Sequence, residues 1–211
     1  MTGEGSGIWN REIIRAAEVI GRGGIVAFPT ETFYGLAVDP FNASALRRLF
    51  SLKGRPPGKP ILVLIDGVER LSSLVREVPP AYQRLIGRFW PGPLTLIFPG
   101  REHLPPLLTD NRGTIGIRWS SHPAATRLAA ACGGVITGTS ANPSGWPAAV
   151  TAADLKKLFQ VGLDYVIEGG RTPGGLSSTI IDSGDETVRL IRPGAISFAE
   201  IQAAARLDRR P

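Results

Sequence analysis

The stretch GRGGIVAFPTETFYGLAVD, residues 21–39, leads the chain from a helical pattern into an apolar strand and then into a polar segment. Before it, apolar residues recur at helical spacing from Ile13 to Ile20, with Asn10 as the expected N-cap. The glycines of this stretch end the helix, and Ile25 to Phe28 has the composition of a strand. The chain therefore opens with helix, turn and strand.

The rest of the sequence continues this alternation of helix and strand. Helices are predicted at 42–50, 80–89, 123–131, 152–159 and 198–206, and strands at 61–65, 94–98, 115–119, 135–137, 165–167, 179–181 and 188–191. Such alternation predicts an α/β fold around one mixed sheet flanked by helices. With 211 residues, 43% of them hydrophobic, and no long linker, we expect a single domain over residues 1–211.

The overall charge is basic. The chain has 24 Lys and Arg against 18 Asp and Glu, a formal charge of +6. A basic surface attracts polyanions such as nucleotides or RNA, although an ordinary basic surface gives the same count. No run of like charges forms a basic arm that would hold nucleic acid alone.

Cysteine and histidine are scarce. Cys132 is the sole cysteine, and His103 and His122 are the only histidines. This excludes a disulfide framework and leaves too few ligands for a zinc site, so we predict no bound metal site and a reducing, cytoplasmic setting. The first residues lack a signal-peptide layout, and the longest aliphatic run, Ile61 to Ile65, is too short to cross a bilayer, so no membrane association is expected.

The segment KGRPPGKP, residues 53–60, gathers three cations on what is predicted to be a stiff loop. Lys53, Arg55 and Lys59 could neutralise the oxygens of a triphosphate, or they could form a solvated basic loop. The segment is not a Walker A loop, because its glycines are one residue too close and Pro60 stands where Ser or Thr would bind magnesium. A P-loop NTPase is therefore not expected.

Two further segments are rich in hydroxyl groups. In PTETFYG, residues 29–35, an extended backbone would put Thr30, Thr32 and Tyr34 on one face. Glu31 would then point to the opposite face, as a general base or, more in keeping with its position, as a structural carboxylate. This pattern suits a small polar substrate.

The segment GTSANPSG, residues 138–145, follows a short predicted strand. Its side chains Thr139, Ser140 and Asn142 could bind phosphate or ribose at the strand end. A turn whose Ser and Asn satisfy their own backbone explains the same composition, and on this segment alone it is the better interpretation.

Seven motifs in order resemble the YrdC-like threonylcarbamoyl-AMP synthases. They are PTET-x-YGL, the KGRP loop, FWPGPLTLIF at 89–98, GIR at 116–118, TSAN-x-SG, SSTIID at 177–182 and RPGAIS at 192–197. The resemblance runs from about residue 13 to 197, with a short helix after it. It implies a twisted α/β domain with a deep positive cleft. The implied enzyme is a nucleotidyltransferase that makes threonylcarbamoyl-AMP and pyrophosphate from L-threonine, bicarbonate or CO2, and ATP, for threonylcarbamoyladenosine in tRNA.

The resemblance also assigns residues to substrates. It implies that Lys53 and Arg55 are catalytic and that the ATP contacts are Lys53, Arg55, Lys59, Thr139, Ser140, Asn142 and Arg192. It implies that threonine is surrounded by Thr32, Tyr34, Arg118 and Ser178. Magnesium would enter with ATP, because no cluster of Asp and Glu would hold it alone.

The sequence also departs from longer members of that family. They carry a histidine where this chain has Leu64, and they continue into an added domain, so this chain resembles the short, single-domain form. A downstream tRNA threonylcarbamoyl-transferase complex would take the product. The alternatives are a non-enzymatic protein that binds double-stranded RNA or tRNA weakly, and a carbamoyl-transfer domain of the kind found in hydrogenase maturation proteins.

Overall fold

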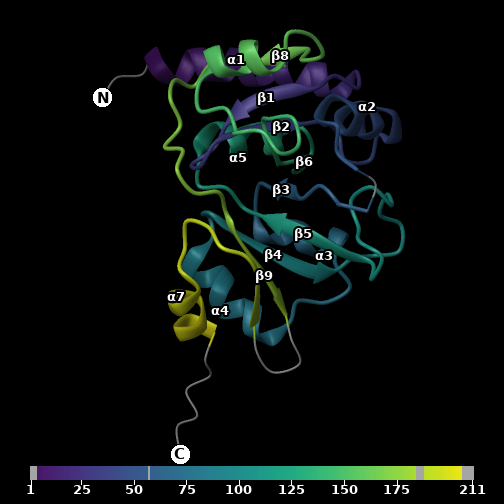
Figure 1. Ribbon diagram of the computed structural model, residues 1–211, viewed down its shortest axis with the longest axis vertical. Coiled ribbons are helices and arrows are strands. Elements are labelled where there is room, and N and C mark those ends of the chain that lie inside the picture. The colour runs from purple at the N-terminus through teal and green to yellow at the C-terminus, as the bar shows by residue number, and fades with distance from the viewer. Residues whose placement is uncertain (1–3, 57, 184–187, 206–211) are drawn as a thin grey trace, which may run out of the picture.

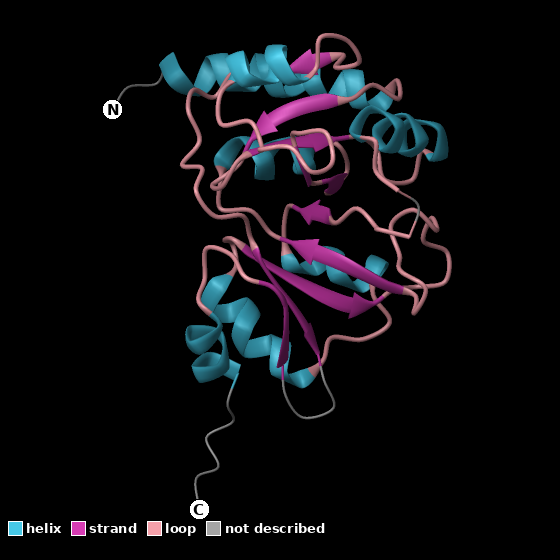
Figure 2. Ribbon diagram, viewed as in Figure 1, coloured by secondary structure: helices cyan, strands magenta, loops and turns pink. Residues whose placement is uncertain are grey.

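Two β-sheets form the centre of the molecule in this computed structural model, which describes residues 4–56, 58–183 and 188–205. Figures 1 and 2 show the smaller sheet above the larger one, with helices at both ends of the view. The predicted α/β class is confirmed. The predicted single mixed sheet is wrong, because strand pairing divides the strands into two sheets.

The smaller sheet has the order β7-β2-β1-β8. Its strands are β1 (Val26–Pro29), β2 (Tyr34–Ala37), β7 (Thr139–Ser140) and β8 (Tyr165–Val166). Strands β1 and β2 form an antiparallel hairpin, in which Pro29 lies opposite Tyr34, and β8 runs parallel to β1. The PTET segment is therefore the connection of a hairpin.

The larger sheet has the order β10-β9-β4-β5-β3-β6. Its strands are β3 (Val63–Ile65), β4 (Leu94–Pro99), β5 (Thr114–Arg118), β6 (Val135–Thr137), β9 (Thr179–Ser183) and β10 (Val188–Arg192). The pairs β3–β5 and β4–β9 are parallel, whereas the other three are antiparallel, so this sheet is mixed.

Thr137 joins the two sheets. Its backbone N–H donates to the Val38 carbonyl at 3.1 Å, and its Oγ1 accepts from the Val38 N–H at 2.9 Å. The same hydroxyl donates to the Leu36 carbonyl at 3.2 Å, and the residue is fully buried. A buried hydroxyl that both donates and accepts is fully used, so Thr137 fixes the end of β6 against the end of β2.

The helices cover the outer faces of the sheets. They are α1 (Glu4–Gly21), α2 (Ala43–Lys53), α3 (Leu71–Leu74), α4 (Pro80–Phe89), α5 (Pro123–Ala131), α6 (Ala152–Leu158) and α7 (Phe198–Ala205), with a 3-10 turn η1 (Val68–Arg70). In Figure 1, α1 lies over the smaller sheet, and α4 and α7 lie together beside the larger sheet. One apolar cluster reaches from Ala27 and Leu36 in the smaller sheet to Leu96 and Ile181 in the larger one.

Two helix boundaries differ from the prediction. Asn10 lies inside α1 and is not its N-cap, because the helix already begins at Glu4. Asn42 does cap α2, since its Oδ1 accepts from two backbone N–H groups, but this helix runs on to Lys53. Gly54 ends it in the left-handed region at φ 55°, which glycine adopts without steric cost. Lys53 is thus the last residue of a helix and not part of a loop.

Two smaller points complete the comparison with the predicted elements. Arg206, the predicted end of the last helix, lies outside the described residues. Among the helices that the structure describes, none is long and apolar enough to span a membrane.

Candidate functional site

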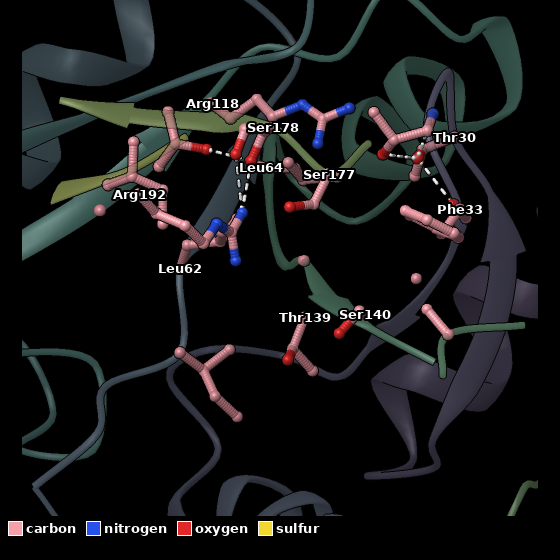
Figure 3. Close-up of a pocket in the computed structure, with 18 of the residues that line it drawn as sticks. Thr30, Phe33, Leu62, Leu64, Arg118, Thr139, Ser140, Ser177, Ser178 and Arg192 are labelled. Atoms are coloured by element: carbon pink, nitrogen blue, oxygen red, sulfur yellow. Dashed lines mark hydrogen bonds between the residues drawn. The ribbon is translucent and has the colours of Figure 1, made fainter. Parts of the chain in front are cut away.

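A cleft of about 370 Å³ lies where the two sheets face each other. Its wall is built by the β1–β2 connection, Arg55 and residues 60–64, strands β4 and β5, the chain from 138 to 148, residues 177–180, and Ile191 and Arg192. Figure 3 shows these lining side chains. The volume falls within the range of about 300–1,000 Å³ that is usual for small-molecule sites.

Cations outnumber anions in the cleft wall. Arg55, Arg118 and Arg192 line it from three separate parts of the chain, and Asp110 is the only carboxylate among the described lining residues. Asp110 already pairs with Arg112 at 2.9 Å, outside the lining. Burial, and then the charges of Arg118 and Arg55, lower the pKa of Arg192. Three guanidinium groups that repel one another favour an anionic ligand.

Arg118 is the most enclosed of these cations. It is 5% exposed at the end of β5, and its Nη2 lies 2.6 Å from Oε1 of Glu31. Burial tends to raise the pKa of Glu31, but the Arg118 charge and a hydrogen bond from Ser120 outweigh it and hold the pKa below its ordinary value. Glu31 is therefore ionised at neutral pH.

Arg118 nevertheless has unused donors. Within the described residues, neither its Nε nor its Nη2 has a hydrogen-bond partner, because the contact with Glu31 has the distance but not the angles of a hydrogen bond. A buried N–H without an acceptor costs about 1–3 kcal/mol. Oxygen atoms of an anion in the cleft would remove this cost.

Ser178 and Arg192 lie together in the wall next to Arg118. The Nη2 of Arg192 donates to the Ser178 carbonyl at 2.8 Å and to its Oγ at 3.1 Å, as the dashed lines of Figure 3 show. The buried Oγ of Ser178 also lies 2.9 Å from Oγ1 of Thr95. The structure thus brings one predicted threonine contact beside one predicted nucleotide contact.

Lys53 does not line the cleft. Its side chain is buried, and Nζ donates to the carbonyls of Ser140 and Asn142 at 2.5 and 2.7 Å. Burial, and then the charge of Arg55, lower the pKa of this ammonium to about 7. Lys53 therefore connects the end of α2 to the chain that follows β7.

The other predicted nucleotide contacts differ in their exposure to the cleft. Arg55 lines it, although its Nε and Nη2 donate to the carbonyls of Lys59 and Pro60 at 2.7 and 2.8 Å. The Lys59 side chain is exposed and lies outside the lining. These two cations of the KGRPPGKP segment thus have unequal access to a bound ligand.

The TSAN segment lines the cleft and also satisfies part of its own polar surface. Thr139, Ser140 and Asn142 are all lining residues. Ser140 Oγ donates to Asn142 Oδ1 at 2.6 Å, and Asn142 Nδ2 donates to the Trp146 carbonyl. The turn interpretation and the ligand interpretation of this segment are therefore compatible.

The PTET segment turns sharply and does not run extended. Thr30 Oγ1 donates to the Phe33 carbonyl at 2.7 Å and lies 3.0 Å from Thr32 Oγ1, so the two hydroxyls meet through a turn. The Tyr34 hydroxyl donates to the Gly170 carbonyl at 2.8 Å. The predicted extended backbone is wrong, because the strand begins only at Tyr34, but Thr30, Thr32 and Tyr34 all line the cleft.

The sequence pattern did not single out several lining residues. These are Thr95, Thr114, Ser177, Trp146 and Ile191, of which Trp146 is 64% exposed. Thr95 and Ser177 stand inside the quoted motifs, but a motif does not say which of its side chains faces a ligand. Leu64, which takes the place of the histidine of longer relatives, lines the cleft. In the described part of the chain, no cluster of His, Cys, Asp and Glu could hold a metal ion.

Two sheets that enclose an arginine-lined cleft define an α/β protein whose cleft suits a small anionic molecule. The chain belongs to the Sua5_yciO_yrdC family, described as "Telomere recombination", whose model matches residues 18–194. This match covers most of the chain and includes all seven motifs except the end of RPGAIS.

Relatives with a stated activity share much of the sequence. The chain is 38% identical to a threonylcarbamoyl-AMP synthase of Pyrococcus abyssi over 89% of its own length and 55% of the relative's. It is 41% identical to a threonylcarbamoyl-AMP synthase of Thiobacillus denitrificans over 76% of its own length and 85% of the relative's. The chain thus spans only about half the length of some curated relatives.

A solved structure supports the same relationship. The crystal structure of Pyrococcus abyssi Sua5 complexed with L-threonine matches with a TM-score of 0.87 and 38% identity. The match covers 91% of this chain and 56% of that one.

Proposed function

We propose that this chain forms threonylcarbamoyl-AMP and pyrophosphate from L-threonine, bicarbonate or CO2, and ATP, as a nucleotidyltransferase in tRNA threonylcarbamoyladenosine synthesis. The observation that carries the proposal is Arg118, a buried cation in the cleft wall whose Nε and Nη2 have no hydrogen-bond partner in the described residues. A carboxylate is the planar anion that a guanidinium binds best. The names of the relatives supply the substrates.

The two substrates occupy different parts of the cleft in this proposal. The carboxylate of threonine binds Arg118, with Ser178 and Thr32 beside it. The triphosphate binds toward Arg55 and Arg192, and Thr139, Ser140 and Asn142 contact the nucleotide. Magnesium would enter with ATP and would offset part of the phosphate charge, since no cluster of His, Cys, Asp and Glu in the described residues could hold it alone.

The reaction needs no protein nucleophile. The threonine amine attacks CO2 and loses a proton to give a carbamate. A carbamate oxygen then forms a bond to the α-phosphorus while the bond to pyrophosphate breaks. The cleft contributes by holding the reactants in line and by placing guanidinium groups where negative charge builds up on the phosphates. Lys53 and Tyr34 contribute indirectly, since their polar atoms bind backbone groups.

Pyrophosphate release tests the proposal directly. The purified chain is incubated with ATP, magnesium and bicarbonate, with and without L-threonine, in the absence of RNA. We expect release that requires both threonine and bicarbonate, and a product with the mass of threonylcarbamoyl-AMP. Equal release when threonine is omitted would remove the proposal.

RNA binding is the alternative that the charge of +6 and three arginines in one cleft would also suit, although the names of the relatives do not favour it. Contacts chiefly to phosphates would weaken steeply with salt, and ATP would compete for the same cleft. Selective tRNA binding that ATP and threonine leave untouched, without any adenylate product, would make it the better function.

The proposed setting is the cytoplasm, where a tRNA threonylcarbamoyl-transferase complex would use the product.

A further inference from the structure

Glu31 contacts the cleft arginine but does not itself line the cleft. Its Oε1 lies 2.6 Å from Arg118 Nη2, and the two side chains are only 15% and 7% exposed. An ion pair that is shielded from water to this degree is held more tightly than a surface pair. The Glu31 carboxylate takes no part in the steps of the proposed reaction.

The second oxygen of Glu31 is also fixed. Ser120 Oγ donates to Oε2, and this buried hydroxyl accepts from the backbone N–H of His122 at 3.2 Å. The Ser120 carbonyl in turn accepts from Thr126 Oγ1 at 2.9 Å, in the first turns of α5. A chain of contacts therefore runs from α5 through Ser120 and Glu31 to Arg118.

This arrangement does not suit a general base. The carboxylate lies outside the cleft lining, with Arg118 in the wall. Its Oε2 accepts a hydroxyl hydrogen bond and its Oε1 lies 2.6 Å from the Arg118 guanidinium, so the carboxylate is engaged outside the cleft lining. A general base must be within hydrogen-bond reach of the proton that it takes.

A counter-ion for Arg118 is needed for another reason. Arg118 and Arg192 are close enough for the charge of one to affect the pKa of the other. Without a nearby anion, this repulsion would favour movement of the Arg118 side chain before the substrate arrives. Glu31 reduces the repulsion and leaves Nε and Nη2 of Arg118 without a hydrogen-bond acceptor.

We propose that Glu31 is a positioning residue that holds Arg118 ready for the carboxylate of the amino-acid substrate. The inference rests on the proposed function only for the identity of that substrate. Removing the charge of Glu31 should weaken threonine binding and leave ATP binding largely intact, because Glu31 contacts Arg118 and Ser120 and none of the residues assigned to the nucleotide.

Glu31→Gln is the main test, since it keeps the shape and removes the charge. We expect the KM for threonine, and its Kd by calorimetry, to rise by about tenfold, the effect of losing a charged contact, with the KM for ATP changed less than about twofold. Glu31→Asp keeps the charge and should recover part of the loss. Ser120→Ala, which frees only one oxygen of Glu31, should give a smaller rise in the threonine KM.

Asp66→Asn is the matched control, because it breaks the Arg70–Asp66 ion pair outside the cleft and should leave both KM values unchanged. An unchanged threonine KM in Glu31→Gln, or equal losses for threonine and ATP, would overturn the positioning role. If Glu31→Gln does not fold, a wild-type threonine KM in both Glu31→Asp and Ser120→Ala would overturn it. A wild-type chain that binds threonine but releases no pyrophosphate contradicts the proposed function alone, and the calorimetric comparison still tests Glu31.

Discussion

The buried cations on the two sides of the cleft differ in their hydrogen-bond partners. On the side of the TSAN segment, Lys53 is 2% exposed and its ammonium donates to two backbone carbonyls. On the opposite side, Arg118 is 5% exposed and keeps two nitrogens without a hydrogen-bond partner in the described residues. Both side chains are almost fully buried, yet only Arg118 lines the cleft. The hydrogen-bond partners of a buried cation, and not its burial, indicate its role.

Loss of Arg118 should have the largest effect. Arg118→Ala removes the proposed carboxylate contact and leaves Glu31 buried without its partner, which typically costs about 2–5 kcal/mol. We expect kcat/KM for threonine to fall by roughly a hundredfold or more, with a lower Tm. Steady-state kinetics and thermal unfolding measure the two effects.

Arg118→Lys separates these two effects. It restores a charge beside Glu31 without the planar fork of donors, so the Tm should recover more than the activity. Full activity in Arg118→Lys would show that a point charge suffices for threonine binding. The contrast drawn between Lys53 and Arg118 would then not hold.

Loss of Lys53 should have an intermediate effect of a different kind. A sequence-based view of Lys53 as a loop cation would leave folding unaffected, but the structure places it in the core. Lys53→Met keeps the apolar length and removes the bonds to Ser140 and Asn142. We expect unfolding to become easier by about 1–3 kcal/mol and turnover to fall by about tenfold, since the nucleotide-binding segment loses its support.

Chemical denaturation and ATP kinetics check this prediction. A Lys53→Met chain of wild-type stability and low activity would favour a direct phosphate contact, as the sequence resemblance implies. That result would mean that Lys53, like Arg118, contacts a ligand directly.

Loss of Lys59 should have the smallest effect. Its side chain is exposed, and only its backbone carbonyl is used, as the acceptor for Arg55. Lys59→Ala should therefore change the KM for ATP less than about twofold, because a single exposed charge contributes little. A tenfold rise in the KM for ATP would show that the KGRPPGKP segment moves to contact the bound nucleotide.

Much of the fold could be predicted because its signals are local. Asn42 caps α2 as expected, and most strands lie where apolar runs predict them. Strand β2 was missed, because its four residues include Gly35 and gain their strand structure from pairing with β1. The division into two sheets depends on pairs such as β4–β9, whose residues are far apart in sequence. No local pattern encodes such pairing.

The sequence predicted which residues belong to the candidate site better than it predicted where their side chains point. Arg55, Arg118 and Arg192 were named from motifs, and all three line the cleft. The direction of Lys53 could not be foreseen, since its acceptors lie 87 and 89 residues further along the chain. Glu31 lies outside the cleft lining that includes Thr30 and Thr32, and its partner Arg118 comes from a strand of the larger sheet, so no local pattern predicts this pair.

The junction at Thr137 has a mechanical consequence for this site. The hydroxyl and backbone of one residue bind both Leu36 and Val38, so this junction couples the two sheets in addition to the apolar cluster that they share. A shift of one sheet when a ligand binds is therefore transmitted to the other sheet through the hydrogen bonds of Thr137. Because Arg192 and Ser178 are also hydrogen-bonded to each other, the amino-acid side and the nucleotide side of the cleft are not mechanically independent.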